Sequence, residues 1–166
     1  MQHRLFIPLF VSLLVGAASN AAAQSPLAVT LESYLVTEVT LEDGTTEEQL
    51  VAAEVAEPGQ VLEYHLTLEN SSDNPLPGGI AATGPVPAQT HYLGASAQQE
   101  ADSSLTFSAD EGETFAVTPT ITVVDEDGNE QEVNAEPEQY DAVRWQLLAE
   151  LAPGQTRTFV YRVRVL

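Results

Sequence analysis

The stretch Leu62–Glu69 reads LEYHLTLE, with a large apolar or aromatic side chain at every second position. Successive side chains of an extended strand point to opposite faces, so the apolar set shares one face and the polar set shares the other. This pattern predicts a half-buried β-strand. The same reasoning, applied along the chain, gives the residues that we expect in the core: Leu62, Tyr64, Leu66, Leu68, Trp145, Leu147, Phe159, Tyr161 and Val163.

Alternation of this kind recurs on both sides of that strand, whereas no long segment has the period of an amphipathic helix. An Ala-rich stretch, Gln49–Val55, is the only part where we expect a helical turn, ended by Pro58-Gly59. Asp127-Gly128 lies between two short strand-like runs and predicts a hairpin, because Gly accepts the positive φ of such turns. The chain is therefore expected to be all-β, a single Ig-like antiparallel β-sandwich of about seven to nine strands.

The charge of the chain is strongly one-sided. It has 166 residues, with 25 Asp and Glu against five basic residues, all of them Arg, and a net charge of −20. Such a surface repels polyanions, so nucleic acid is excluded as a partner, and attachment to an anionic lipid surface is disfavoured for the same reason. The absence of Cys excludes disulfides and thiolate zinc sites.

The first residues have the order of an export signal. His3 and Arg4 precede an apolar run of about a dozen residues, shorter than the roughly 20 that a membrane span needs. Ala21-Ala22-Ala23 fits a cleavage site. We expect a signal peptide over 1–23 and a sandwich domain over 24–166 that lies in the periplasm or outside the cell, with no membrane span. A buried N-terminal helix is the alternative.

Three segments, in order, resemble the signature elements of the bacterial conserved repeat domain, a domain of unknown function (number eleven in its series). They are Glu57–Ser72, with its Pro-Gly start and Tyr-x-Leu-x-Leu-x-Asn pattern, Ala82–Tyr92, and Trp145–Phe159 with its Leu-x-Pro-Gly step. Gly84 stands where that family commonly has Asp. The resemblance implies an Ig-like sandwich that acts as a structural or adhesive module outside the cytoplasm, and it implies no catalytic activity.

A second, shorter motif resembles the Asp-box of sialidase-like propellers, where it is structural. It consists of Ser108, Asp110, Gly112, Thr114 and Phe115. Side chains of Asp and Ser bond to nearby backbone amides in such corners, and Gly supplies the turn. The chain is too short for a propeller, so we expect a single structural turn.

An acidic turn gives the best candidate for a metal. Asp125, Asp127 and Asn129 place hard oxygen ligands around the predicted hairpin turn, as Ca²⁺ prefers. The loop is not an EF-hand, because its Gly comes at the fourth position. Extracellular calcium sites bind weakly, at roughly 10⁻⁴ to 10⁻³ M. We expect a solvated acidic turn without any cofactor, and calcium bound at these three residues is the alternative interpretation.

Signs of catalysis are few. His65 and His91 are the only histidines after the signal, and neither lies in a nucleophile motif such as G-x-S-x-G. We expect a non-enzymatic module with a structural or protein-interaction role, whose partner is an envelope or extracellular protein. The alternative hypothesis is a calcium-stabilised glycan-binding accessory domain.

Overall fold

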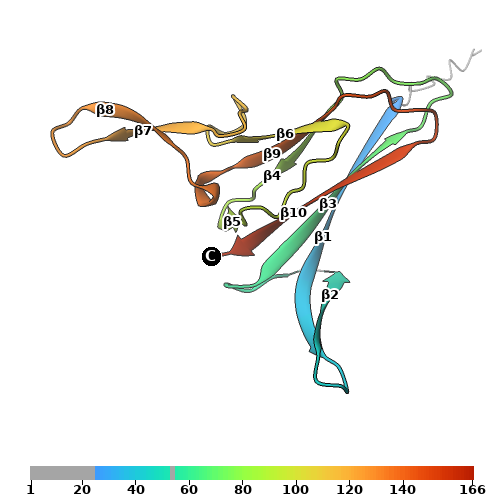
Figure 1. The fold of residues 1–166 in the computed structure, drawn as a ribbon, viewed down its shortest axis with the longest axis horizontal. Coiled ribbons are helices and arrows are strands. Elements are labelled where there is room, and N and C mark those ends of the chain that lie inside the picture. Colours follow the sequence, from blue (N-terminus) through green and yellow to red (C-terminus); the bar gives the residue numbers. More distant parts are fainter. Residues whose placement is uncertain (1–24, 53–54) are drawn as a thin grey trace, which may run out of the picture.

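The computed structural model describes residues 25–52 and 55–166, so the predicted signal peptide lies outside the described residues. The described chain is an antiparallel β-sandwich, which confirms the expected all-β fold (Figure 1). The larger layer has the strand order β2-β1-β3-β10-β5, and the smaller layer has the order β4-β9-β6. A third, two-stranded sheet is formed by β7 and β8. In the described part of the chain, no helix is long and apolar enough to cross a membrane.

Turns and longer loops connect the elements along the chain. They are β1 (Leu27–Thr40), β2 (Thr46–Ala52), β3 (Val61–Asn70), β4 (Ala81–Pro85), β5 (Thr90–Tyr92), β6 (Ser103–Ser108), β7 (Thr120–Val124), β8 (Glu130–Asn134), the 3₁₀ helix η1 (Pro137–Gln139), β9 (Ala142–Leu147) and β10 (Thr156–Val165).

The core lies between the two layers, on the face that the alternation predicts. Leu66 and Leu68 of β3 are almost completely buried, and Leu62 and Tyr64 lie at the margin of the same apolar cluster. The rings of Trp145 from β9 and Phe159 from β10 stack across the layers, with their centroids 5.0 Å apart. Aromatic stacking of this kind adds to the free energy gained by burying the rings.

The expected helical turn at Gln49–Val55 is wrong for its first four residues. Gln49–Ala52 belong to β2, which pairs antiparallel with β1 in a register that places Leu50 opposite Val36. Helix propensity is a weak preference that tertiary context overrides. Here β1 continues past the end of β3, and β2 pairs with the other edge of β1 from Tyr34 to Thr40.

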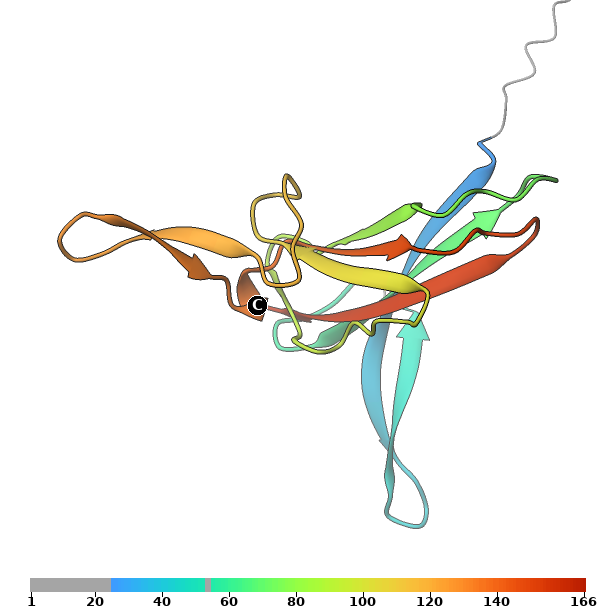
Figure 2. The ribbon, with the colours of Figure 1, turned by 45° about the horizontal axis from the view of Figure 1, so that its top comes forward.

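Two hairpins project from the sandwich (Figure 2). Strand β3 pairs with β1 only as far as Val36, so the β1–β2 hairpin continues past the end of the sandwich. All seven residues of β2 are exposed. The β7–β8 hairpin extends in another direction and hydrogen-bonds to neither layer through its strands. These hairpins place backbone edges and side chains far from the core.

Candidate functional site

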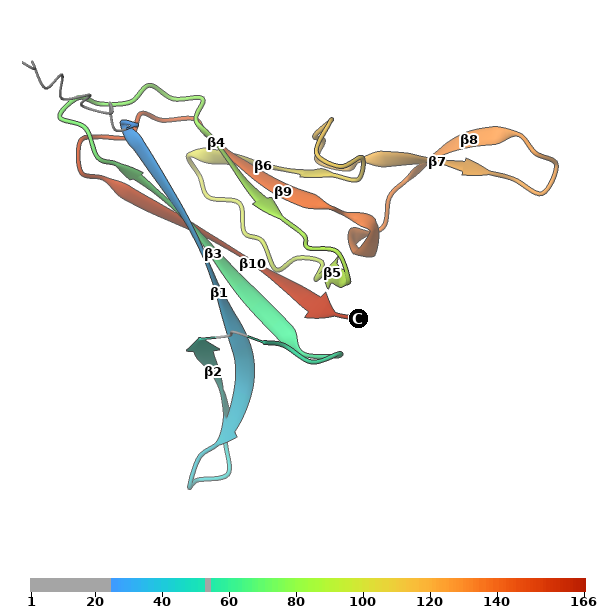
Figure 3. The same cartoon turned by 180° about the vertical axis from the view of Figure 1, so that it is seen from behind.

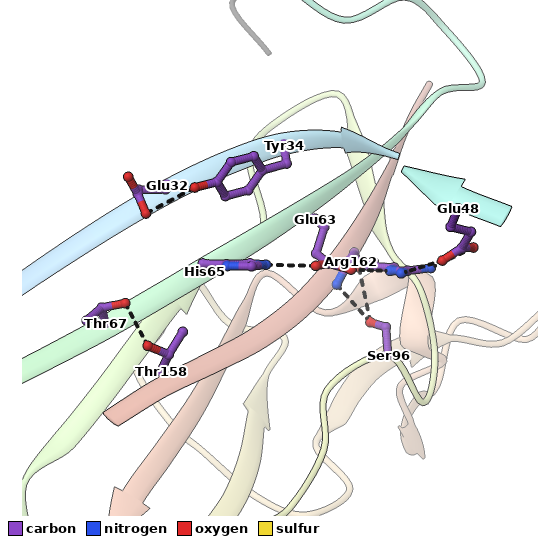
Figure 4. A network of polar contacts seen from close by, with 9 residues as sticks. All are labelled: Glu32, Tyr34, Glu48, Glu63, His65, Thr67, Ser96, Thr158 and Arg162. Atoms are coloured by element: carbon purple, nitrogen blue, oxygen red, sulfur yellow. Dashed lines mark hydrogen bonds and ion pairs between the residues drawn. The ribbon is translucent and has the colours of Figure 1, made fainter. Parts of the chain in front are cut away.

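A polar network lies on the outer face of the larger layer, with Arg162 at its centre (Figure 4). The Nε of Arg162 donates to Oε2 of Glu63 at 2.7 Å, and its two terminal nitrogens donate to the carboxylate of Glu48 at 3.1 and 2.7 Å. Glu63 is only 7% exposed. One guanidinium thus joins three strands: β10, which carries it, β3 and β2.

The network continues across the sheet toward β1. Nε2 of His65 lies 2.7 Å from Oε1 of Glu63, so the Glu63 carboxylate has a partner at each oxygen. The His65 ring also contacts the ring of Tyr34, with centroids 4.9 Å apart, and the Tyr34 hydroxyl donates to Glu32 at 3.2 Å. These contacts hold the outer face of β10, β3 and β1 together.

Arg162 and Glu48 each favour the charged form of the other. Hydrogen bonds from Arg162 hold the pKa of Glu48 below its ordinary value, and the two carboxylates raise the pKa of Arg162. The Glu48 side chain is half exposed, so solvent screens this pair and its contribution to the free energy of folding is small. Its effect is geometric: it ties β2, and with it the projecting hairpin, to the sandwich.

Beside Arg162 the surface has an open depression of about 570 Å³, lined by Glu63, Ser96, Glu100 and Thr158 among others. The backbone N–H of Arg162 donates to Oγ of Ser96 at 3.0 Å, which fixes the β5–β6 loop at its rim. Catalysis by such a group of residues needs a nucleophile next to a base. In the described structure, the partners of His65 are Glu63 and Tyr34, and no hydroxyl nucleophile hydrogen-bonds to its ring.

A second arginine joins the two layers at the end of the sandwich. Arg157 of β10 pairs with Glu100 and Asp102, which precede β6, and one of its bonds to Asp102 measures 2.7 Å. These bonds lower the pKa of Asp102. The contact fixes how β6 lies over β10.

The Asp-box-like residues form a self-contained turn after β6. The backbone N–H of Gly112 donates to Oγ of Ser108 at 2.8 Å, and Thr114 donates to Asp110 through both its N–H, at 2.9 Å, and its hydroxyl, at 2.5 Å. These bonds lower the pKa of Asp110. Gly112 has a φ of +82°, which L residues rarely adopt. The half-buried ring of Phe115 carries the guanidinium of Arg144, whose Cζ lies 3.4 Å from the ring centroid.

The acidic turn of the β7–β8 hairpin is arranged around Asp125. Oδ1 of Asp125 accepts the backbone N–H groups of Asp127 and Asn129, at 3.0 and 2.8 Å, and Oδ2 accepts the amide of Gln131 at 2.9 Å. Asn129 and Asp127 therefore meet Asp125 as hydrogen-bond donors. Among the described residues, no three His, Asp or Glu side chains gather as a metal site would require. The calcium hypothesis stays a prediction.

Reasoning from the sequence did not identify the network around Arg162. The alternation does place Glu63 and His65 on the polar face of one strand, and Arg162 on the polar face of another. The register between these strands, which brings Arg162 opposite Glu63, depends on the fold. The sequence could not assign Glu48 to this network, because the Ala-rich stretch Gln49–Val55 that follows it favours a helical turn.

No model of a protein family matches the chain, and comparisons with curated proteins and with solved structures found no significant match. The resemblance to the conserved repeat domain therefore rests on the three quoted segments alone.

Proposed function

We propose that this chain is an exported, non-enzymatic Ig-like sandwich that binds a protein partner in the bacterial periplasm or at the cell surface. The observation that carries the proposal is the pair of projecting hairpins, which expose apolar side chains outside the core. These residues are Val39, Leu41, Leu50 and Val51 on the β1–β2 hairpin and Val123, Val124 and Val133 on the β7–β8 hairpin.

Open strand edges and exposed apolar side chains favour binding of another chain. A partner strand gains main-chain hydrogen bonds from such an edge, and the alternate side chains give selectivity. The tie between Arg162 and Glu48 supports this role, since it holds the β1–β2 hairpin in one orientation. A hairpin that is already ordered loses less conformational entropy on binding than a mobile one.

The acidic surface limits the choice of partner. A net charge of −20 disfavours other acidic proteins and favours a partner with a basic contact surface. Export follows from the order of residues 1–23, and it places that partner outside the cytoplasm.

A cross-linking experiment tests the proposal, and the chain suits it because it has no Cys. Gln49→Cys on β2 and Asp127→Cys on the β7–β8 turn each receive a photoactivatable maleimide probe. Glu150→Cys, exposed in the β9–β10 loop, is the matched control. After irradiation with the envelope fraction of the source bacterium, we expect discrete adducts from a hairpin site and none from position 150. Equal adducts from all three positions, or none from either hairpin, would overturn the proposal.

A further inference from the structure

The first half of β1 has an open edge. Residues Leu27–Ser33 pair with β3 on one side, whereas pairing with β2 on the other side begins only at Tyr34 (Figure 3). Because successive residues of a strand turn their N–H and C=O groups to opposite edges, every second residue of this segment presents these groups at the open edge of the described structure. Such an edge is a template for another strand.

The inner face of the same segment is not covered by the smaller layer. Val29 and Leu31 pair with Leu68 and Leu66 of β3, so they point to the core side of the sheet. Both core partners are buried, yet Val29 is 58% exposed and Leu31 is 41% exposed. The smaller layer ends at β4, whose outer edge pairs with no described strand. An apolar stripe is thus left beside the open edge.

We propose that two copies of this chain pair antiparallel through Leu27–Ser33, with Thr30 on the two-fold axis. The two five-stranded layers then form one continuous sheet. A two-fold contact requires a self-complementary surface, because both copies contribute the same residues to it. This interface lies away from the hairpins, so the inference stands independently of the proposed function.

The register about Thr30 meets that requirement. It places Val29 opposite Leu31 of the second copy, twice, on the uncovered inner face. It places Glu32 opposite Ala28, so the two glutamates of the interface do not face each other. Cross-strand apolar pairs of this kind stabilise a sheet, whereas like charges directly opposite destabilise it.

The ends of the segment fit the same arrangement. Among the described residues, Ala52 is the last of β2 that pairs with β1, opposite Tyr34, and Val55 lies in no strand. Pro26, which precedes β1, has no backbone N–H and bends the chain, and its carbonyl accepts the N–H of Ser71 at 3.0 Å. The entering strand therefore leaves the sheet before it reaches Ala52 of the second copy.

Charge selects this edge over the outer edge of β2. Strand β2 carries two acids, Glu47 and Glu48, whereas Leu27–Ser33 contains one, Glu32, so a symmetric pairing through β1 brings fewer negative charges into the contact. The overall charge of −20 still opposes association. Dimer formation should therefore strengthen with salt, which screens this repulsion over about 10 Å at 0.1 M and less at higher concentration.

Cysteine cross-linking of the purified chain tests the register. Under mild oxidation, Thr30→Cys should give a disulfide-linked dimer, because the two Thr30 positions face each other within the range of a disulfide. Ala28→Cys, on the same exposed edge, should not, because its copies lie about four residues apart along the strands. Equal cross-linking of both variants, or of neither, would overturn the proposed pairing.

The mass in solution tests the association itself. Light scattering after gel filtration should give twice the monomer mass in about 0.5 M NaCl. At this salt concentration, the repulsion between the acidic copies is screened beyond a few ångströms. Val29→Lys should restore the monomer with an unchanged circular dichroism spectrum, and Leu148→Lys, at another exposed apolar position, should not. A monomer under all conditions, or a dimer that survives Val29→Lys, would overturn the inference. Both outcomes are independent of the cross-linking test of partner binding through the two hairpins.

Discussion

Gly84 of β4 lies directly against the ring of Tyr161 of β10, and a β-carbon at position 84 would lie 2.5 Å from Cε1 of that ring. The Tyr161 hydroxyl donates to the carbonyl of Pro85 at 2.6 Å, which keeps the ring in place. This contact sets the spacing between the two layers. It also gives a physical reason why this position holds Gly.

Gly84→Ala should destabilise the sandwich by about 1–3 kcal/mol, the usual cost of overpacking a core. Tyr161 is completely buried and hydrogen-bonded, so it cannot move aside cheaply. Urea unfolding measures the effect. Gly94→Ala is the matched control, since its new methyl group would come no closer than 3.4 Å to Pro137. Equal midpoints for the two variants would contradict the close contact.

Tyr161 should also make stability depend on alkaline pH. Burial raises its pKa above the ordinary value, so the folded state keeps the phenol protonated. The protonated phenol of Tyr161 contributes fully to the free energy of folding below its unfolded-state pKa of about 10. This contribution is lost as the pH rises toward the folded-state pKa. Tyr161→Phe should therefore lose stability less steeply above pH 10, as measured by thermal unfolding across the alkaline range. A slope identical to that of the unaltered chain would argue against the shift.

Arg162→Gln should loosen the β1–β2 hairpin and weaken the sandwich. It removes the tie to Glu48 and leaves the buried Glu63 carboxylate without its guanidinium, a loss of about 1–3 kcal/mol. Hydrogen exchange should become faster in β2. Arg144→Gln, which loses contacts to Phe115 and Thr83 only, should leave exchange in β2 as it was. Unchanged exchange after Arg162→Gln would show that the tie does not order the hairpin.

The same tie should respond to acid. Because the pKa of Glu48 is lowered in the folded state, its bond to Arg162 persists above the ordinary Glu pKa of about 4.3 and is lost as the pH falls through the folded-state value. Exchange of β2 amides should be constant, after correction for intrinsic rates, from neutral pH to about 5. In Glu48→Gln it should be fast throughout. Loss of protection in the unaltered chain already near pH 6 would point to another group.

Calcium should stabilise the chain no more than sodium at equal ionic strength. Both oxygens of Asp125 already accept hydrogen bonds within the turn, so a cation would have to displace them. Thermal unfolding in CaCl₂, NaCl and EDTA checks this. A calcium-specific rise in melting temperature that Asp125→Asn abolishes would instead establish the site.

The residue pattern predicted the fold class and most of the core, because alternation depends only on the pleat of a strand. Trp145, Phe159 and Tyr161 lie where it places them. It could not reveal which strands are neighbours, and the pairing of Arg162 with Glu63 depends on that. Nor could it show that Val29 and Leu31, although on the core face, extend beyond the smaller layer.

The central claim, binding of a partner through the projecting hairpins, is tested most directly by shortening one of them. Replacing residues 39–47 with Asn-Gly, a dipeptide suited to two-residue hairpins, keeps Glu38 opposite Glu48 and removes the distal part. The partner identified by cross-linking at position 49 is then titrated calorimetrically with both chains. The account predicts that the shortened chain keeps the melting temperature of the sandwich and loses binding. Undiminished affinity would contradict it.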